Sequence, residues 1–105
     1  MKYAHFREDR SKSELPGLDE AKEFTVGEKM VCIANVGGTI SAVDNVCLHR
    51  GGPMGQGMIE QGKIVCPWHG WQYDPKSGTA VHNPAARLKI YPIKVEGDDV
   101  LVEID

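Results

Sequence analysis

Cysteine is scarce in this chain of 105 residues, which contains three cysteines and four histidines. Three thiols cannot form the paired framework of a small secreted domain, so a reducing, cytoplasmic location is expected. No apolar run is long enough to cross a membrane. The first ten residues carry charges where a signal peptide needs an apolar stretch. The net charge of −3 argues against nucleic acid as a partner, because nucleic acid favours a basic surface.

Helical periodicity is also almost absent. Short apolar or alternating segments are instead separated by turn signals such as Gly27-Glu28, Gly37-Gly38 and Gly97-Asp98. The predicted strands are 3–6, 21–26, 29–34, 39–43, 87–95 and 100–104, and the apolar run 30–34 is expected to be fully buried. An all-β fold of antiparallel strands is therefore expected. With 41% hydrophobic residues and this length, we expect a single domain, 1–105, that is a monomer.

Residues 45–74 break the strand rhythm with closely spaced glycines, and they contain two related hexapeptides. The first is Cys47-Leu48-His49-Arg50-Gly51-Gly52 and the second is Cys66-Pro67-Trp68-His69-Gly70-Trp71. Each offers a thiolate, which is a soft ligand, and an imidazole, which is a borderline ligand. Together they predict a metal centre with four ligands and two chemically different ends, formed by Cys47, His49, Cys66 and His69. The glycines allow two loops to bend tightly around that centre.

The order Cys-x-His, sixteen residues, Cys-x-x-His resembles the Rieske iron–sulfur family, in which a [2Fe–2S] cluster has two Cys on one iron and two His on the other. The resemblance extends to Gly51-Gly52, Pro67, Gly70 and the segment Gln72-Tyr73-Asp74, which is followed by the turn-like Pro75-Lys76-Ser77-Gly78. It implies an antiparallel Rieske domain with a β-sandwich or barrel-like base, 1–44 and 75–105, and a small cluster-binding subdomain, 45–74. One [2Fe–2S] cluster of the Rieske type is then the cofactor, with Cys47, His49, Cys66 and His69 as metal ligands.

Within the family, the segment Cys66 to Trp71 is most similar to Rieske ferredoxins and to the Rieske domains of ring-hydroxylating oxygenases. The chain is too short to contain a catalytic oxygenase domain as well. The resemblance therefore implies a soluble one-electron carrier between a flavin-dependent, NAD(P)H-linked reductase and a terminal oxygenase, with no catalytic residues of its own. Two alternatives are the small Rieske subunit of an assimilatory nitrite reductase and a structural zinc-binding interaction module.

Departures from the membrane-complex members of the family bear on the reduction potential. Those members carry a disulfide between the positions of Gly52 and Trp68, and a serine donor at the position of Trp71. Tyr73 matches a tyrosine that donates to a cysteine sulfur in the family. Because hydrogen bonds to the sulfurs raise the potential, we expect a value near the low end of the Rieske range, roughly −150 mV.

The remaining candidates have simpler interpretations. Cys32 lies in an apolar segment and is expected to be a buried small hydrophobe. Trp71 is expected to shield the cluster and Trp68 to contact a partner. Arg50, beside a predicted ligand, is expected to steer an acidic partner surface.

Overall fold

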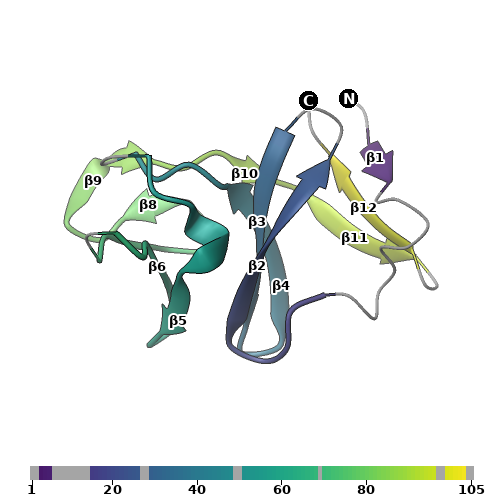
Figure 1. The fold of residues 1–105 in the computed structure, drawn as a ribbon, viewed down its shortest axis with the longest axis horizontal. Coiled ribbons are helices and arrows are strands. Elements are labelled where there is room, and N and C mark those ends of the chain that lie inside the picture. Colours follow the sequence, from purple (N-terminus) through teal and green to yellow (C-terminus); the bar gives the residue numbers. More distant parts are fainter. Residues whose placement is uncertain are drawn as a thin grey trace.

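The structure is a computed structural model that describes residues 3–5, 15–26, 29–48, 51–68, 70–96 and 99–103. Twelve strands and one 3-10 turn occur in these ranges (Figure 1). The elements are β1 (Tyr3–His5), β2 (Glu20–Val26), β3 (Lys29–Val36), β4 (Thr39–Asp44), η2 (Met54–Gln56), β5 (Met58–Glu60), β6 (Lys63–Val65), β7 (Gln72–Tyr73), β8 (Thr79–Ala80), β9 (Asn83–Arg87), β10 (Ile90–Tyr91), β11 (Ile93–Glu96) and β12 (Asp99–Glu103).

The strands form three antiparallel sheets, which confirms the predicted fold class. A three-stranded sheet has the order β1-β12-β11 and a four-stranded sheet the order β10-β4-β3-β2. A third sheet, with the order β5-β6-β7-β8-β9, is referred to below as the small sheet. Figure 1 shows the small sheet at one end of the molecule, the strands β2 to β4 in the middle, and β1, β11 and β12 at the other end.

Two hydrophobic cores lie on opposite faces of the four-stranded sheet, which is called the middle sheet below. Along β3, Val31 and Ile33 pack in the core toward the C-terminal strands, whereas Cys32 and Ala34 pack in the core that includes residues of the small sheet. All four side chains are fully buried. The alternation follows from the period of two in a strand, which sends successive side chains to opposite faces. The strand is thus buried on both faces over 31–34, as predicted, whereas Met30, which was also expected to be buried, is exposed.

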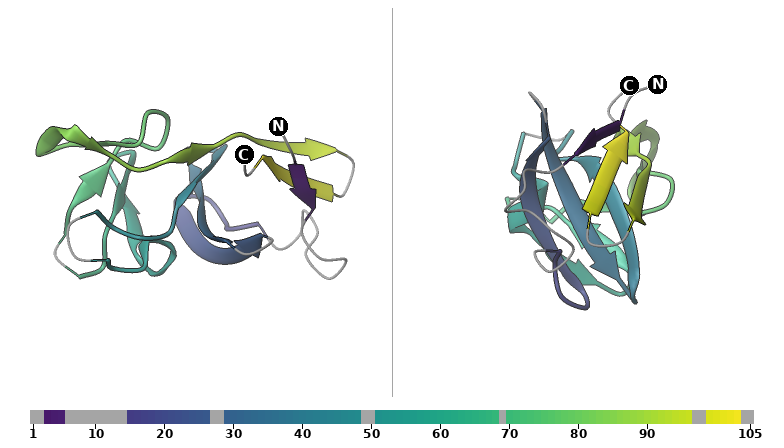
Figure 2. Two further views of the ribbon diagram at one scale, coloured as in Figure 1. Left: turned by 90° about the horizontal axis from the view of Figure 1, so that it is seen from above. Right: turned by 90° about the vertical axis from the view of Figure 1, so that its right-hand side faces the viewer.

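The predicted strand 87–95 is wrong as a single element. The chain there divides into the end of β9, then β10 and β11, and Pro92 separates the last two. Proline has no N–H to donate to a ladder, so pairing stops and the chain changes sheets. β10 pairs with β4, and β11 pairs with β12. Figure 2 shows this segment running along the molecule from the small sheet to the C-terminal strands.

Three short strands, β5, β6 and β7, lie in the region 45–74, where the sequence indicated only loops. Each has two or three residues, too few for a clear alternation of apolar and polar side chains. Strands β8 and β9, which follow residue 74, pair onto the same sheet. The division into a base and a cluster-binding subdomain stays a prediction. No helix in the described part of the chain is long and apolar enough to span a bilayer.

Candidate metal centre

The first cysteine loop leaves the end of β4 and is closed by two backbone hydrogen bonds. The Cys47 N–H donates to the Gly52 carbonyl at 2.9 Å, and the Gly51 N–H donates to the Cys47 carbonyl at 2.8 Å. Gly51 has a φ of 77°, a left-handed conformation that glycine adopts without steric cost. An isolated bridge between Val46 and Pro53 continues the pairing below the loop. The loop is therefore a closed hairpin with the cysteine at its base.

The second cysteine loop follows β6 and closes in the same way. The Cys66 N–H donates to the Trp71 carbonyl at 2.8 Å, and the Gly70 N–H donates to the Cys66 carbonyl at 3.1 Å. Gly70, four residues after the cysteine as Gly51 is in the first loop, has a φ of 75°. The two hexapeptides are thus closed by the same pair of backbone hydrogen bonds, with a left-handed glycine at the same place, and both cysteines occupy equivalent positions.

The two loops touch at Gly52. A Cβ atom built there would lie 2.7 Å from Cys66 Sγ and 3.1 Å from Trp68 Cγ, too close for any side chain. Gly52 and Trp68 are also the positions joined by a disulfide in the membrane-complex proteins, and here the indole packs against the glycine. The absence of a side chain at position 52 lets the first loop approach the sulfur of the second. The structure therefore brings both predicted cysteine ligands to one place.

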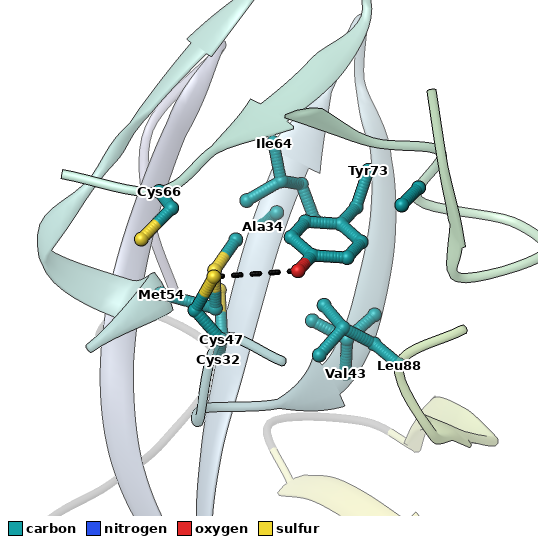
Figure 3. Packing of buried hydrophobic residues seen from close by; sticks show 10 residues of the cluster. Cys32, Ala34, Val43, Cys47, Met54, Ile64, Cys66, Tyr73 and Leu88 are labelled. Atoms are coloured by element: carbon teal, nitrogen blue, oxygen red, sulfur yellow. Dashed lines mark hydrogen bonds between the residues drawn. The ribbon is translucent and has the colours of Figure 1, made fainter. Parts of the chain in front are cut away.

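Cys47 and Cys66 are buried, with exposed fractions of 2% and 3%, and neither forms a disulfide. Both belong to the core that contains Tyr73 (Figure 3). A buried thiolate is costly unless its charge is compensated, and a bound metal does this. Two such thiols on glycine-bent loops fit an iron–sulfur or zinc centre. The described part of the chain contains no cluster of three or more metal-binding side chains. The predicted ligands His49 and His69, as well as Arg50, lie outside the described residues.

Tyr73 connects the second loop's hairpin to the first loop. Its hydroxyl lies 3.3 Å from Cys47 Sγ (Figure 3) and accepts a hydrogen bond from the Leu48 N–H at 3.2 Å. Burial raises the pKa of the Tyr73 hydroxyl, and the bond to Cys47 raises it further. The phenol therefore keeps its proton and can donate to a cysteine sulfur that carries none. This contact agrees with the donor role predicted for Tyr73.

Three further predictions can be compared with the geometry. Cys32 is fully buried, and burial raises the pKa of its thiol to about 12, so it behaves as the small hydrophobe that was predicted. Trp71 packs against the cysteine-containing core, and its ring centroid lies 6.3 Å from that of Tyr73. Trp68 is 56% exposed, as a partner contact would be. The shielding and contact roles themselves stay predictions.

The turn-like segment Pro75-Lys76-Ser77-Gly78 forms a third loop of the same design, a likeness to the cysteine loops that was not predicted. The Asp74 N–H donates to the Thr79 carbonyl at 2.9 Å, and the Gly78 N–H donates to the Asp74 carbonyl at 2.8 Å. Gly78 has a φ of 77°, as Gly51 has. The sequence signal was a glycine four residues after the first residue of the loop, which all three loops share. This third loop has an aspartate where the others have cysteine.

Comparisons with known proteins agree with this geometry. Residues 6–92 match the family model described as the Rieske [2Fe-2S] domain. The ferredoxin component of the naphthalene 1,2-dioxygenase system of Pseudomonas aeruginosa is 36% identical over 81 residues, which are 76% of this chain and 78% of that protein.

Two solved structures have the same fold. The ferredoxin of carbazole 1,9a-dioxygenase from Nocardioides aromaticivorans IC177 has a TM-score of 0.84 at 19% identity, with 100% of both chains covered. A chain from the complex of reduced oxygenase and oxidized ferredoxin in carbazole 1,9a-dioxygenase has a TM-score of 0.74 at 21% identity, covering 88% of this chain and 95% of that one. The chain therefore belongs to the Rieske [2Fe–2S] domain family, whose cofactor is a Rieske-type [2Fe–2S] cluster.

Proposed function

We propose that this protein is a one-electron carrier that takes electrons from an NAD(P)H-dependent flavin reductase and delivers them to a terminal oxygenase. The observation that carries this proposal is the junction of the two cysteine loops at Gly52, with both sulfurs buried in one core. The ferredoxin component of a dioxygenase system, similar over most of both chains, supports the assignment of the partner. The protein makes and breaks no substrate bonds itself.

We assign Cys47 and Cys66 as ligands of one iron and His49 and His69 as ligands of the other. When bound, the cluster accepts and releases one electron. The chain supplies the two thiolates, holds them on loops closed by backbone hydrogen bonds, and keeps water from the cysteine end by burial. Tyr73 donates to Cys47 Sγ and so favours the reduced, more negative state. We propose that residues 45–74 form the cluster-binding subdomain and that residues 1–44 and 75–105 form the base.

Exposed apolar side chains on the two cysteine loops support a docking face at this end of the molecule. Leu48 and Trp68 are 48% and 56% exposed, and neighbouring Val46 is 52% exposed. Single exposed hydrophobes are common, but three around one proposed centre fit a small and transient electron-transfer contact. The reductase and the oxygenase would use this face in turn, with the protein acting as a cytoplasmic monomer. Arg50 would add electrostatic steering toward an acidic partner.

A potentiometric titration of the anaerobically purified protein, followed by electron paramagnetic resonance, tests this function. We expect a Rieske-type signal in the reduced state, with a midpoint near the low end of the family range, roughly −150 mV. Cys47→Ser should abolish the signal, whereas the matched control Cys32→Ser should keep it. A colourless protein containing zinc would refute the carrier function. Reduction by a nitrite reductase flavoprotein but by no oxygenase-linked reductase would change the partner.

A further inference from the structure

We propose that Glu23, on β2, is a positioning residue that holds the first cysteine loop in place through Asn45 and Gln56. These three side chains are called the carboxylate clasp below. The effect on the cluster rests on the proposed function, but the anchoring of the loop can be measured separately. The proposal concerns where the loop sits relative to the base, and assigns Glu23 no contact with iron.

The clasp consists of two amide groups that donate to one carboxylate. Asn45 Nδ2 donates to Glu23 Oε2 at 2.7 Å, and Gln56 Nε2 donates to Glu23 Oε1 at 3.0 Å. Asn45 Oδ1 accepts a hydrogen bond from the Gly55 N–H at 2.7 Å. Because a backbone N–H can only donate, this bond fixes which way the Asn45 amide points. Its nitrogen must therefore face Glu23, and only an acceptor can sit there.

Asn45 leads directly to the first cysteine through a continuous set of backbone contacts. Its carbonyl accepts from the Met54 N–H at 2.8 Å, and Val46 then bridges to Pro53. The next step is the closing bond of the Cys47 loop. Asn45 is itself 5% exposed, so its polar groups depend on these partners rather than on water. Displacing Asn45 would therefore displace the base of the loop.

The turn η2 is pressed against β2 at the same place. A Cβ atom built on Gly55 would lie 2.6 Å from the backbone nitrogen of Glu23, so only glycine allows this approach. The close approach brings the Gln56 amide within reach of the carboxylate. β2 thus contacts η2, the segment that follows the Cys47 loop, with both its backbone and the charged side chain of Glu23.

The second cysteine loop is supported differently. Cys66 follows β6, which pairs with β5 and β7 of the small sheet. None of the hydrogen bonds found for Glu23 reaches the Cys66–Trp71 loop in the described part of the chain. The clasp therefore acts on one half of the centre, and its loss should move the first loop relative to the second.

An exchange of amide and carboxylate between Glu23 and Asn45 tests the clasp with side chains of unchanged size. In Glu23→Gln, a nitrogen replaces one acceptor oxygen, and the exposed Gln56 amide can turn its own oxygen toward that nitrogen. In Asn45→Asp, two carboxylates meet at hydrogen-bond distance. In the double variant, the new amide at position 23 can donate to the new carboxylate at position 45, while its oxygen accepts from Gln56. That carboxylate still accepts from the Gly55 N–H, so every group has a partner again.

Two quantities should be measured on the purified proteins: the rate at which an iron chelator removes the cluster, and amide hydrogen exchange by mass spectrometry. Asn45→Asp should release the cluster about tenfold faster, because a part-buried hydrogen bond to a charged group is replaced by repulsion between two carboxylates. Glu23→Gln should have a smaller effect, because the exposed Gln56 can adapt to it. Exchange should rise in segment 45–57 but not in segment 66–80. The double variant should return both quantities to within about threefold of the wild type.

Val102→Ala is the matched control, because Val102 is fully buried in the other core, on the C-terminal side of the middle sheet. It should raise exchange throughout the chain. An Asn45→Asp variant that behaves like this control, or that releases the cluster at the wild-type rate, would overturn the proposal. So would a double variant no better than Asn45→Asp. Absence of an iron signal from the wild type would refute the proposed function instead, and exchange in segment 45–57 would still decide the clasp.

Discussion

The Cys66–Trp71 loop and the Asp74–Thr79 loop are close in sequence and are closed by the same pair of backbone hydrogen bonds, but they stabilise their first side chain in different ways. In the third loop, Asp74 Oδ1 accepts hydrogen bonds from the N–H groups of Lys76 at 2.8 Å and Ser77 at 3.2 Å. The bond from Lys76 is the main reason why the pKa of the Asp74 carboxyl is lowered. The charge of the aspartate is thus compensated within its own loop.

A thiolate at the same position depends more strongly on a compensating positive charge, because Cys66 is 3% exposed whereas Asp74 is only partly buried. The loop geometry alone therefore does not require metal, but a buried anion at its base does. The third loop serves as an internal control that separates the contribution of the backbone from that of the cluster.

Removal of the cluster should have the largest effect and should affect the loops unequally. We expect amide exchange to rise strongly in segments 45–52 and 66–71, where the thiolates lose their compensating charge. Segment 74–80 should stay protected, because its hydrogen bonds do not involve metal. Exchange measured on chelator-treated and intact protein checks this. Equal loss of protection in all three loops would show that the third is not independent.

Alanine substitutions at the left-handed glycines should separate two losses in the free energy of unfolding, one from an unfavourable φ and one from a steric clash of the new Cβ. Gly78→Ala should lower the free energy of unfolding by about 3 kcal/mol, because a Cβ would lie 2.2 Å from the Leu88 carbonyl oxygen in addition to the unfavourable φ. Gly70→Ala should lower it by only about 1 kcal/mol, since a Cβ there would meet no heavy atom within 4 Å in the described part of the chain.

Denaturant unfolding of the intact protein measures both losses. Gly62→Ala is a useful control, because Gly62 also has a φ of 77° and open space around it, but lies in the turn between β5 and β6. Its cost should match that of Gly70→Ala. A Gly78→Ala cost no larger than these would contradict the steric argument.

Tyr73→Phe should lower the reduction potential, because the first loop then loses a donor to Cys47 Sγ. A hydrogen bond worth about 1 kcal/mol corresponds to about 40 mV for a one-electron couple. Ser77→Ala removes the contacts of Ser77 Oγ with Thr79 in the third loop and should leave the potential unchanged. Protein film voltammetry of both variants tests the contrast. A shift of equal size in Ser77→Ala would mean that Tyr73 acts only through general packing.

The smallest effect is expected from pH. Because the pKa of Tyr73 is raised above its ordinary value of 10, the phenol keeps its proton as pH rises from 7 to 10. The difference in potential between wild type and Tyr73→Phe should therefore stay constant over this range, while titration of other groups shifts both proteins alike. A difference that shrinks toward pH 10 would show that the hydroxyl ionises at its ordinary pKa.

Much of this architecture could be predicted from the sequence, because the relevant signals are local. The two Cys-containing hexapeptides indicated where the loops are, and the apolar run 30–34 indicated a buried strand, which the structure shows over 31–34. The Glu23–Asn45 contact joins residues 22 apart in the chain and has no local pattern. The turn at 75–78 was indicated, but its likeness to the cysteine loops was missed, because the only feature they share in sequence is the position of the glycine. The break at Pro92 depends on a change of sheet that periodicity cannot show.

β3 has a consequence for how the molecule unfolds. Its central residues, Val31 to Ala34, belong alternately to the core that holds the cysteines and to the core behind it. Both cores are bounded by the same strand, β3, so neither core can unfold while the other keeps its packing. The strands of the molecule should therefore be lost in one cooperative transition, even though the loops above them differ in their need for metal.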